Sequence, residues 1–189
     1  MLALLDRDGV LNQDRADHVK NPDELVMLPG AAEAVAQLNR AGWKVALVSN
    51  QSGLGRGLFD ETMFARIQEK LNEGLRAAGG HLDATFVCPD APWAAGPRRK
   101  PAPGMLEDAM RQFRASAGDA VMIGDALRDL EAAAKIGVRR ILVRTGKGAA
   151  TQAAGLPAHV LPTEVHDDLR AAVGALLEMG SNGETHGES

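Results

Sequence analysis

One stretch near the start of the chain decides the fold: Leu2-Ala3-Leu4-Leu5-Asp6-Arg7-Asp8-Gly9. Its apolar half is short and has no polar alternation, which predicts a buried parallel strand. Asp6 and Asp8 follow at the C-terminal end, two positions apart and therefore on the same side of the backbone. Gly9 then lets the chain turn away. Because open α/β sheets bind ligands at the carboxyl ends of their strands, we expect chemistry at this place.

The pair Asp6 and Asp8 predicts a metal site. Two neighbouring carboxylates repel each other unless a cation neutralises them, and oxygen-only ligands favour Mg²⁺. The alternative is a helix-capping turn that happens to be acidic. Three further motifs, later in the chain, favour the metal interpretation.

The bulk composition is that of one globular domain. The chain has 189 residues, of which 45% are hydrophobic and 24% charged, so it can bury a full core. Its net charge of −4 gives no reason to expect nucleic acid or an anionic membrane as a partner. Any phosphate site must therefore be built from local cations. We expect a monomer that acts on a small molecule.

Cysteine usage and hydropathy predict the compartment. Cys88 is the only cysteine, so no internal disulfide can form and a reducing compartment fits. The apolar strand at residue 2 leaves no room for a signal peptide, and no apolar run approaches membrane-spanning length. We therefore expect a cytoplasmic location.

Strand and helix patterns alternate along the chain. Expected strands lie at Leu2–Asp6, Lys44–Ser49, Ala84–Cys88, Ala120–Gly124 and Arg139–Val143, with a weak sixth around His159–Leu161. Apolar stripes at helical spacing fill the intervals. This α/β pattern predicts one Rossmann-like three-layer α/β/α domain over residues 1–179, with a mostly parallel sheet. Residues 180–189 are rich in Gly and Glu and predict a disordered tail.

The second expected strand ends in a polar, small-residue stretch, Ser49-Asn50-Gln51-Ser52-Gly53. Such residues just past a parallel strand can direct side-chain and backbone donors at a phosphate. The alternative is a polar loop without function. The glycine-rich stretch 53–57 lacks the strand–turn–helix spacing of a dinucleotide fingerprint, so we do not assign it one.

Three consecutive cations, Arg98, Arg99 and Lys100, lie in an irregular loop whose backbone is fixed by prolines. A lysine held in this way can reach a phosphate as a point charge, and an arginine can clamp an anion with two hydrogen bonds. The alternative is a solvated basic patch.

The last motif is Gly-Asp at residues 124–125, at the end of the fourth expected strand. Asp125 is placed to give a metal ion a third carboxylate. Asp129 follows one helical turn later. It is either a residue behind the metal ligands or a first-turn acid that the helix dipole favours.

In this order, Asp-x-Asp-Gly, Ser-Asn, Lys and Gly-Asp-x-x-x-Asp resemble the motifs of the haloacid dehalogenase superfamily of phosphotransferases, over residues 2–145. Closer features resemble the subfamily that combines heptose bisphosphate phosphatases and histidinol phosphatases. These features are the segments 5–12, 49–57, 99–105 and 143–146.

The resemblance implies a role for each motif. Asp6 is expected to be the nucleophile that forms an aspartyl-phosphate, and Asp8 the general acid and then the general base. Mg²⁺ is expected on the Asp6 carboxylate, the Asp8 backbone carbonyl and Asp125. The transferred phosphoryl oxygens are expected to contact the following groups: Ser49, Asn50, Gln51, Ser52 and Lys100.

One departure concerns zinc. Members of this subfamily commonly carry a zinc loop of the form Cys-x-His, a spacer and Cys-x-Cys, just before Arg-Lys-Pro. Here Cys88 is kept, but Asp90 stands at the histidine place, and Gly96 and Arg98 stand at the later cysteines. With a single thiol we expect no zinc. We expect prolines and Trp93 to hold this loop instead.

The motif spacing leaves no room for a large cap domain, so the site is expected to be open. Specificity must then come from the two flanking loops, residues 12–22 and 89–99. Polar groups in the first of these, Asp14, Arg15 and Asp17, can hydrogen-bond sugar hydroxyls.

The resemblance implies a substrate as well: a phosphorylated sugar, heptose 1,7-bisphosphate, which loses its 7-phosphate on the route to lipopolysaccharide. The second phosphate then needs a further cation, and Arg99 has the fork geometry for it. The alternative substrate is histidinol phosphate, which offers no second anion. A receiver-type signalling domain is a further alternative, but its phosphorylated aspartate follows a middle strand rather than the first.

Overall fold

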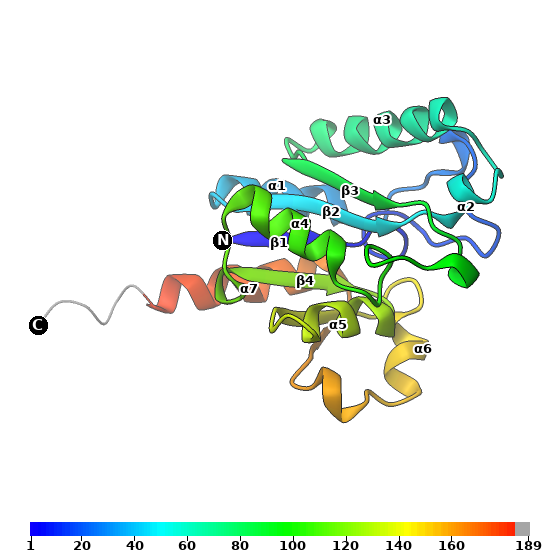
Figure 1. Ribbon diagram of the computed structural model, residues 1–189. Coiled ribbons are helices and arrows are strands. Elements are labelled where there is room, and N and C mark those ends of the chain that lie inside the picture. Colours follow the sequence, from blue (N-terminus) through cyan, green and yellow to red (C-terminus); the bar gives the residue numbers. More distant parts are fainter. Residues whose placement is uncertain (184–189) are drawn as a thin grey trace, which may run out of the picture.

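The computed structural model describes residues 1–183, with side chains up to residue 179. Its centre is one six-stranded sheet in which every pair of neighbours is parallel, in the order β3-β2-β1-β4-β5-β6 (Figure 1). The strands are β1 (Leu2–Leu5), β2 (Lys44–Asn50), β3 (Ala84–Cys88), β4 (Ala120–Gly124), β5 (Arg139–Val143) and β6 (Glu164–His166).

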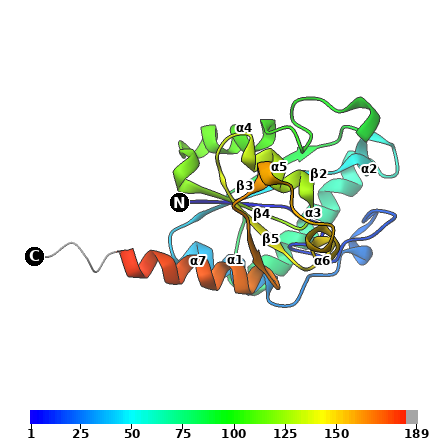
Figure 2. The ribbon, with the colours of Figure 1, turned by 90° about the horizontal axis from the view of Figure 1, so that it is seen from below.

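Helices cover both faces of this sheet, as the view from below shows (Figure 2). Helices α4 and α5 lie on one face, and α1, α3 and α7 lie on the other. The α-helices are α1 (Ala31–Arg40), α2 (Ser52–Gly55), α3 (Glu61–Ala77), α4 (Gly104–Phe113), α5 (Leu127–Ala134), α6 (Gly148–Ala153) and α7 (Leu169–Gly183). Short 3₁₀ turns are η1 (Pro22–Glu24), η2 (Pro92–Ala94), η3 (Ala117–Asp119) and η4 (Ala158–Val160). The predicted three-layer α/β/α fold is confirmed.

Alternate side chains of β1 point to opposite faces of the sheet and contribute to two separate layers of the hydrophobic core. Ala3 and Leu5 pack with α1, α3 and α7, whereas Leu2 and Leu4 pack with α4 and α5. All four side chains of the strand are buried, and a fully buried leucine contributes about 1.5–3 kcal/mol to folding. The continuous apolar run is therefore the sequence of a strand covered on both faces.

Strand β1 is also the point at which the strand order reverses. It pairs with β2 on one side and with β4 on the other, with Leu5 opposite Leu47 and Ile123. In open parallel sheets a crevice forms at such a point, outside the carboxyl ends of the strands. The loops after β1, β2 and β4 therefore meet beside Asp6.

The connections after β1 and β3 are long but carry little regular structure. Among the described residues, the first contains only η1 and the second only η2, so neither forms a cap domain, as predicted. Helix α3 begins as expected at Asp60, whose side chain accepts a 2.7 Å hydrogen bond from the Met63 amide. In the described part of the chain, no helix is long and apolar enough to cross a membrane.

The sixth strand was predicted in the wrong place. Residues 158–160 form η4, and Val160 packs against Leu130 and Leu142. Strand β6 forms later, at residues 164–166, beyond Pro162, because proline cannot donate a ladder hydrogen bond. At the C-terminus, α7 continues through residue 183, into the segment predicted as a tail; the remaining residues, 184–189, lie outside the described part.

Candidate active site

Asp6 lies at the carboxyl end of β1 and is 3% exposed. One carboxylate oxygen accepts the Arg7 amide at 2.8 Å and lies 3.1 Å from Lys100 Nζ. Burial raises the pKa of this carboxyl, while the charge of Lys100 opposes the rise. The structure thus holds a carboxylate and a cation in contact at the predicted place of the nucleophile.

Both the side chain and the backbone of Lys100 are held by hydrogen bonds and ion pairs. Its ammonium group donates to the Val48 carbonyl at 2.7 Å and pairs with Asp129 Oδ1 at 2.8 Å, in addition to Asp6. The Asn50 amide accepts from the Lys100 amide at 3.1 Å and donates to its carbonyl at 2.9 Å. Burial would lower the pKa of Lys100, but Asp129 and Asp6 outweigh it and raise the pKa. The lysine is therefore a charged, immobile group.

Three carboxylates gather beside this lysine: one ligand atom each of Asp6, Asp125 and Asp129 lies within 4.8 Å of the others. Oδ1 of Asp125 is buried and has no hydrogen-bond partner. Burial and the charges of Asp6 and Asp129 raise the pKa of Asp125 to about 7. A buried, unpaired carboxylate oxygen among like charges is a site for a cation.

Two glycines allow this close packing around Asp125. Gly9 and Gly146 have positive φ angles of 84° and 57°. A Cβ atom would lie 2.0 Å from Asp125 Oδ2 if added to Gly9, and 2.2 Å if added to Gly146. Any side chain at either position would occupy the space of the carboxylate itself.

Asp8 is held in its ionised form. Arg7 Nη2 lies 3.0 Å from Oδ1, and the side-chain amides of Asn12 and Gln51 each donate at 2.9 Å. Burial would raise the pKa of Asp8, but the charge of Arg7 and these hydrogen bonds outweigh it and lower the pKa. Gln51 also donates to Ser49 Oγ at 2.8 Å, which joins the loops after β1 and β2. Ser52, at the start of α2, is buried beside them.

The three polar residues predicted to meet the sugar have different partners in the structure. Asp14 lies near the carboxylates: it pairs at 2.9 Å with Lys147 Nζ, and the Lys147 amide donates to Asp125 Oδ2 at 2.8 Å. Arg15 and Asp17 instead pair with each other at 3.2 Å. Among the described residues, the further partners of this pair are His18, Lys20 and Glu24, all in the same part of the chain, and the contact of the pair with the sugar stays a prediction.

The loop before Lys100 is organised by Asp90. Its carboxylate accepts the Gly96 amide at 3.0 Å, and its carbonyl accepts Arg99 Nη1 at 2.5 Å. Trp93, predicted to hold this loop, is instead 75% exposed, with its ring 5.5 Å from the guanidinium carbon of Arg56. Cys88 is a buried free thiol at the end of β3.

Sequence reasoning missed several supporting residues. Asp129 was left between two roles; in the structure it is fully buried and orients Lys100. Arg7 and Asn12 had no assigned role, although they fix Asp8. The role of Arg7 could have been predicted from its position between Asp6 and Asp8, because a buried arginine there can pair with a neighbouring carboxylate.

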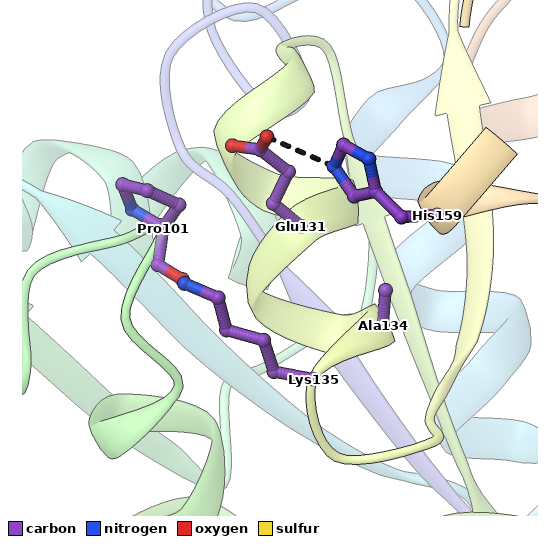
Figure 3. A pocket seen from close by; sticks show the side chains of 5 residues that line it. All are labelled: Pro101, Glu131, Ala134, Lys135 and His159. Atoms are coloured by element: carbon purple, nitrogen blue, oxygen red, sulfur yellow. Dashed lines mark hydrogen bonds and ion pairs between the residues drawn. The ribbon is translucent and has the colours of Figure 1, made fainter. Parts of the chain in front are cut away.

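A surface pocket of about 340 Å³ lies on α5 beside Pro101 (Figure 3). Its polar groups are already paired: His159 Nε2 lies 3.1 Å from Glu131 Oε1, and Lys135 Nζ donates to the Pro101 carbonyl at 2.8 Å. The Lys135 contact anchors the backbone next to Lys100. We therefore assign this pocket a structural role only.

Comparison with known proteins agrees with this geometry. A family model described as HAD-hydrolase-like matches residues 97–172. A D-glycero-β-D-manno-heptose-1,7-bisphosphate 7-phosphatase from Bordetella bronchiseptica is 46% identical over 94% of this chain and 98% of its own length. The protein of the same name from Pseudomonas aeruginosa is 38% identical, over 94% and 98%.

Two solved structures are also similar. The D,D-heptose 1,7-bisphosphate phosphatase from B. bronchiseptica, in complex with magnesium and phosphate, has a TM-score of 0.89 at 45% identity and covers 94% of this chain and 98% of its own. The phosphatase of that name from Burkholderia thailandensis has a TM-score of 0.72 at 42% identity, over 93% and 97%.

Proposed function

We propose that this chain, which belongs to the haloacid dehalogenase-like family of heptose-1,7-bisphosphate 7-phosphatases, removes the 7-phosphate of D-glycero-β-D-manno-heptose 1,7-bisphosphate with Mg²⁺ as cofactor. The observation that carries the proposal is the buried pairing of Asp6 with Lys100, beside the unpaired Asp125 oxygen. This arrangement supports Asp6 as the nucleophile, Lys100 as a fixed cation and Asp125 as a metal ligand, all at one edge of the sheet.

The residues present fit Mg²⁺. Carboxylate oxygens are its preferred protein ligands, and the unpaired Oδ1 of Asp125 has no other use in the fold. Asp6, Asp125 and the backbone carbonyl of Asp8 would hold the ion, since Asp129 is engaged by Lys100. When bound, the ion supplies the positive charge that lets an anionic carboxylate approach an anionic phosphate.

In the first step, a carboxylate oxygen of Asp6 attacks phosphorus while the bond from phosphorus to the sugar oxygen breaks. Lys100 and the Ser49 hydroxyl stabilise the charge on the phosphoryl oxygens. Asp8 gives its proton to the leaving sugar oxygen. The products of this step are the aspartyl-phosphate and heptose 1-phosphate.

In the second step, Asp8 takes a proton from water, which attacks the phosphorus of the aspartyl-phosphate and releases inorganic phosphate. The ionised state of Asp8 in the free protein suits this step. For the first step Asp8 must be protonated, and a dianionic phosphate nearby favours this by raising its pKa. Arg7, Asn12 and Gln51 keep the carboxylate in place for both steps.

The second phosphate of the substrate is assigned to Arg99. Among the described residues, its guanidinium group donates only to the neutral Asp90 carbonyl, so its positive charge is not cancelled by a carboxylate in contact. Asp14, held near Asp125 through Lys147, is placed for the sugar hydroxyls. Histidinol phosphate has no group that would use Arg99. It remains the alternative substrate.

A substrate panel tests this proposal. The full chain is assayed with Mg²⁺ on both anomers of the heptose bisphosphate, on histidinol phosphate and on p-nitrophenyl phosphate. We expect the highest kcat/KM for the β anomer, and no activity after chelation of the metal. A higher kcat/KM for histidinol phosphate would contradict the assignment. The monomeric state and the cytoplasmic location stay predictions.

A further inference from the structure

Arg128 is a cation at the site that the proposed function does not use. It lies in the first turn of α5, directly before Asp129. Its Nε atom is buried and has no hydrogen-bond partner. Within residues 1–183, its guanidinium group forms no hydrogen bond or ion pair with another side chain or carbonyl. A buried N–H donor without a partner destabilises the fold, so the presence of this arginine needs an explanation.

Arg99 and Arg128 directly precede the two members of the buried Lys100–Asp129 ion pair, whose atoms lie 2.8 Å apart, so the two arginines lie on adjoining segments beside the metal ligands. Burial would lower the pKa of Arg128, but the charges of Asp129, Asp6 and Asp125 outweigh it. On the other side, burial lowers the pKa of Arg99, and the charge of Arg128 lowers it further. This mutual repulsion agrees with the placement of the loop before α4 beside the start of α5.

Loading of the site leaves these two arginines without a counter-charge. A divalent cation together with Lys100 balances the three clustered carboxylates. Of the other nearby acids, Asp14 is paired with Lys147, and the Asp90 carboxylate accepts the Gly96 amide rather than a guanidinium N–H. What is left is a pair of cations with free N–H donors. A phosphate dianion is the ligand that neutralises two guanidinium groups and accepts their hydrogen bonds.

We propose that Arg128 and Arg99 together bind the second, non-reacting phosphate group of the substrate. This inference rests on the proposed function, because a substrate with one phosphate has no second group to offer. The reacting phosphate is already met by Lys100, Ser49 and the metal ligands. Arg128 is accordingly a specificity-determining residue. It selects bisphosphates over monophosphates.

The test compares substrates rather than overall activity. Arg128→Met, Arg99→Met and the double variant are assayed on the heptose bisphosphate and on p-nitrophenyl phosphate. Arg111→Met, an exposed arginine on α4, is the matched control. We expect the ratio of the two kcat/KM values to fall about 10- to 100-fold in each single variant, mainly through KM, and not at all in the control. The loss in the double variant should be smaller than the product of the single losses, because both arginines hold one group.

A binding measurement separates this inference from the catalytic assignment. In the Asp6→Asn background, calorimetry with the bisphosphate and Mg²⁺ should show the same weakening on Arg128→Met. Equal losses on both substrates would mean that Arg128 serves the reacting phosphate, and an unchanged ratio would mean that it binds neither; both overturn the inference. If Arg128→Met does not fold, Arg128→Lys takes its place. A wild-type protein without preference for the bisphosphate would instead contradict the proposed function.

Discussion

Lys100 and Asp129 form an ion pair from which solvent is excluded: Nζ lies 2.8 Å from Oδ1, and neither side chain is exposed. The same ammonium group lies 3.1 Å from Asp6. A buried charge whose partner is removed is strongly destabilising. The cation to which we assign the phosphoryl oxygens therefore also stabilises the fold.

Replacing Lys100 by Met should reduce both stability and activity. Because Asp6 and Asp129 lose their buried partner, we expect the free energy of unfolding of the metal-free protein to fall by about 3–5 kcal/mol. Urea unfolding measures this change. The variant Lys100→Met/Asp129→Asn should recover part of the stability without recovering turnover. Recovery of activity in that variant would show that the lysine has no catalytic part.

Asp6→Asn should abolish turnover and leave the fold intact. The substitution removes the nucleophilic anion without changing the volume, and it relieves repulsion with Asp125 and Asp129. We expect kcat to fall at least about 1,000-fold. Asp108→Asn, at a partly buried site on α4 where the carboxylate pairs with Arg111, is the control and should keep full activity. Trapping of a phosphorylated wild-type protein, absent from Asp6→Asn, would give direct support.

Mg²⁺ binding should weaken as the pH falls below neutrality. The pKa of Asp125 in the metal-free protein is about 7, so below that pH the carboxyl must release a proton before it binds a metal. The dissociation constant should therefore rise about tenfold per pH unit in this range and level off above pH 8. Calorimetry between pH 5.5 and 8.5 measures it. The sign of the effect on stability follows: without metal, the contribution of Asp125 is favourable at low pH and is lost as the pH rises through 7.

Arg99→Ala should damage hydrolysis of the bisphosphate more than that of a small monophosphate. The guanidinium has only the Asp90 carbonyl as a hydrogen-bonding partner among the described residues, so its loss should not unfold the loop. We expect KM for the bisphosphate to rise about 10- to 100-fold. Steady-state kinetics on the two substrates checks this. Equal losses would place Arg99 at the reacting phosphate.

The purified protein should contain no stoichiometric zinc. Cys88 is a single buried thiol, and Asp90 forms backbone hydrogen bonds where relatives of this subfamily are expected to have a zinc ligand. Burial raises the pKa of Cys88, so a thiol reagent should modify it slowly until the protein is unfolded. Elemental analysis that found one zinc per chain, with its loss freeing Cys88, would refute this prediction.

Much of the site could be predicted because motifs at strand ends need little tertiary information. Asp6, Ser49 and Asp125 each follow an apolar run that can only be a buried strand, and parallel strands end at one edge. Sheet and helix positions follow from the same periodicity. Each group at that edge can therefore be predicted from its own short segment of sequence.

Side-chain partners could not be predicted in this way. Asn50 is predicted to contribute to the phosphate site, but the sequence did not indicate that both polar atoms of its side-chain amide bind the backbone of Lys100, fifty residues later. Arg15 and Asp17 are predicted to meet the sugar, and the ion pair that they form with each other in the structure could not be predicted from the sequence. Which side chains become partners depends on the path of the loops, and the hydrophobic periodicity of the sequence does not determine that path.

The position of β1 in the middle of the sheet has a consequence for synthesis. The strand that carries Asp6 is synthesised before β2 and β4, yet Leu2–Leu5 pairs with Ala120–Ile123 as well as with β2. Until the later segment emerges, the nascent chain has an apolar strand with one open edge, the kind of segment that chaperones shield. An N-terminal fragment that stops before β4 would lack Asp125 and Asp129 together with the partner of its first strand. We therefore expect such a fragment to have no phosphatase activity, because the proposed site is complete only when β4 has joined the sheet.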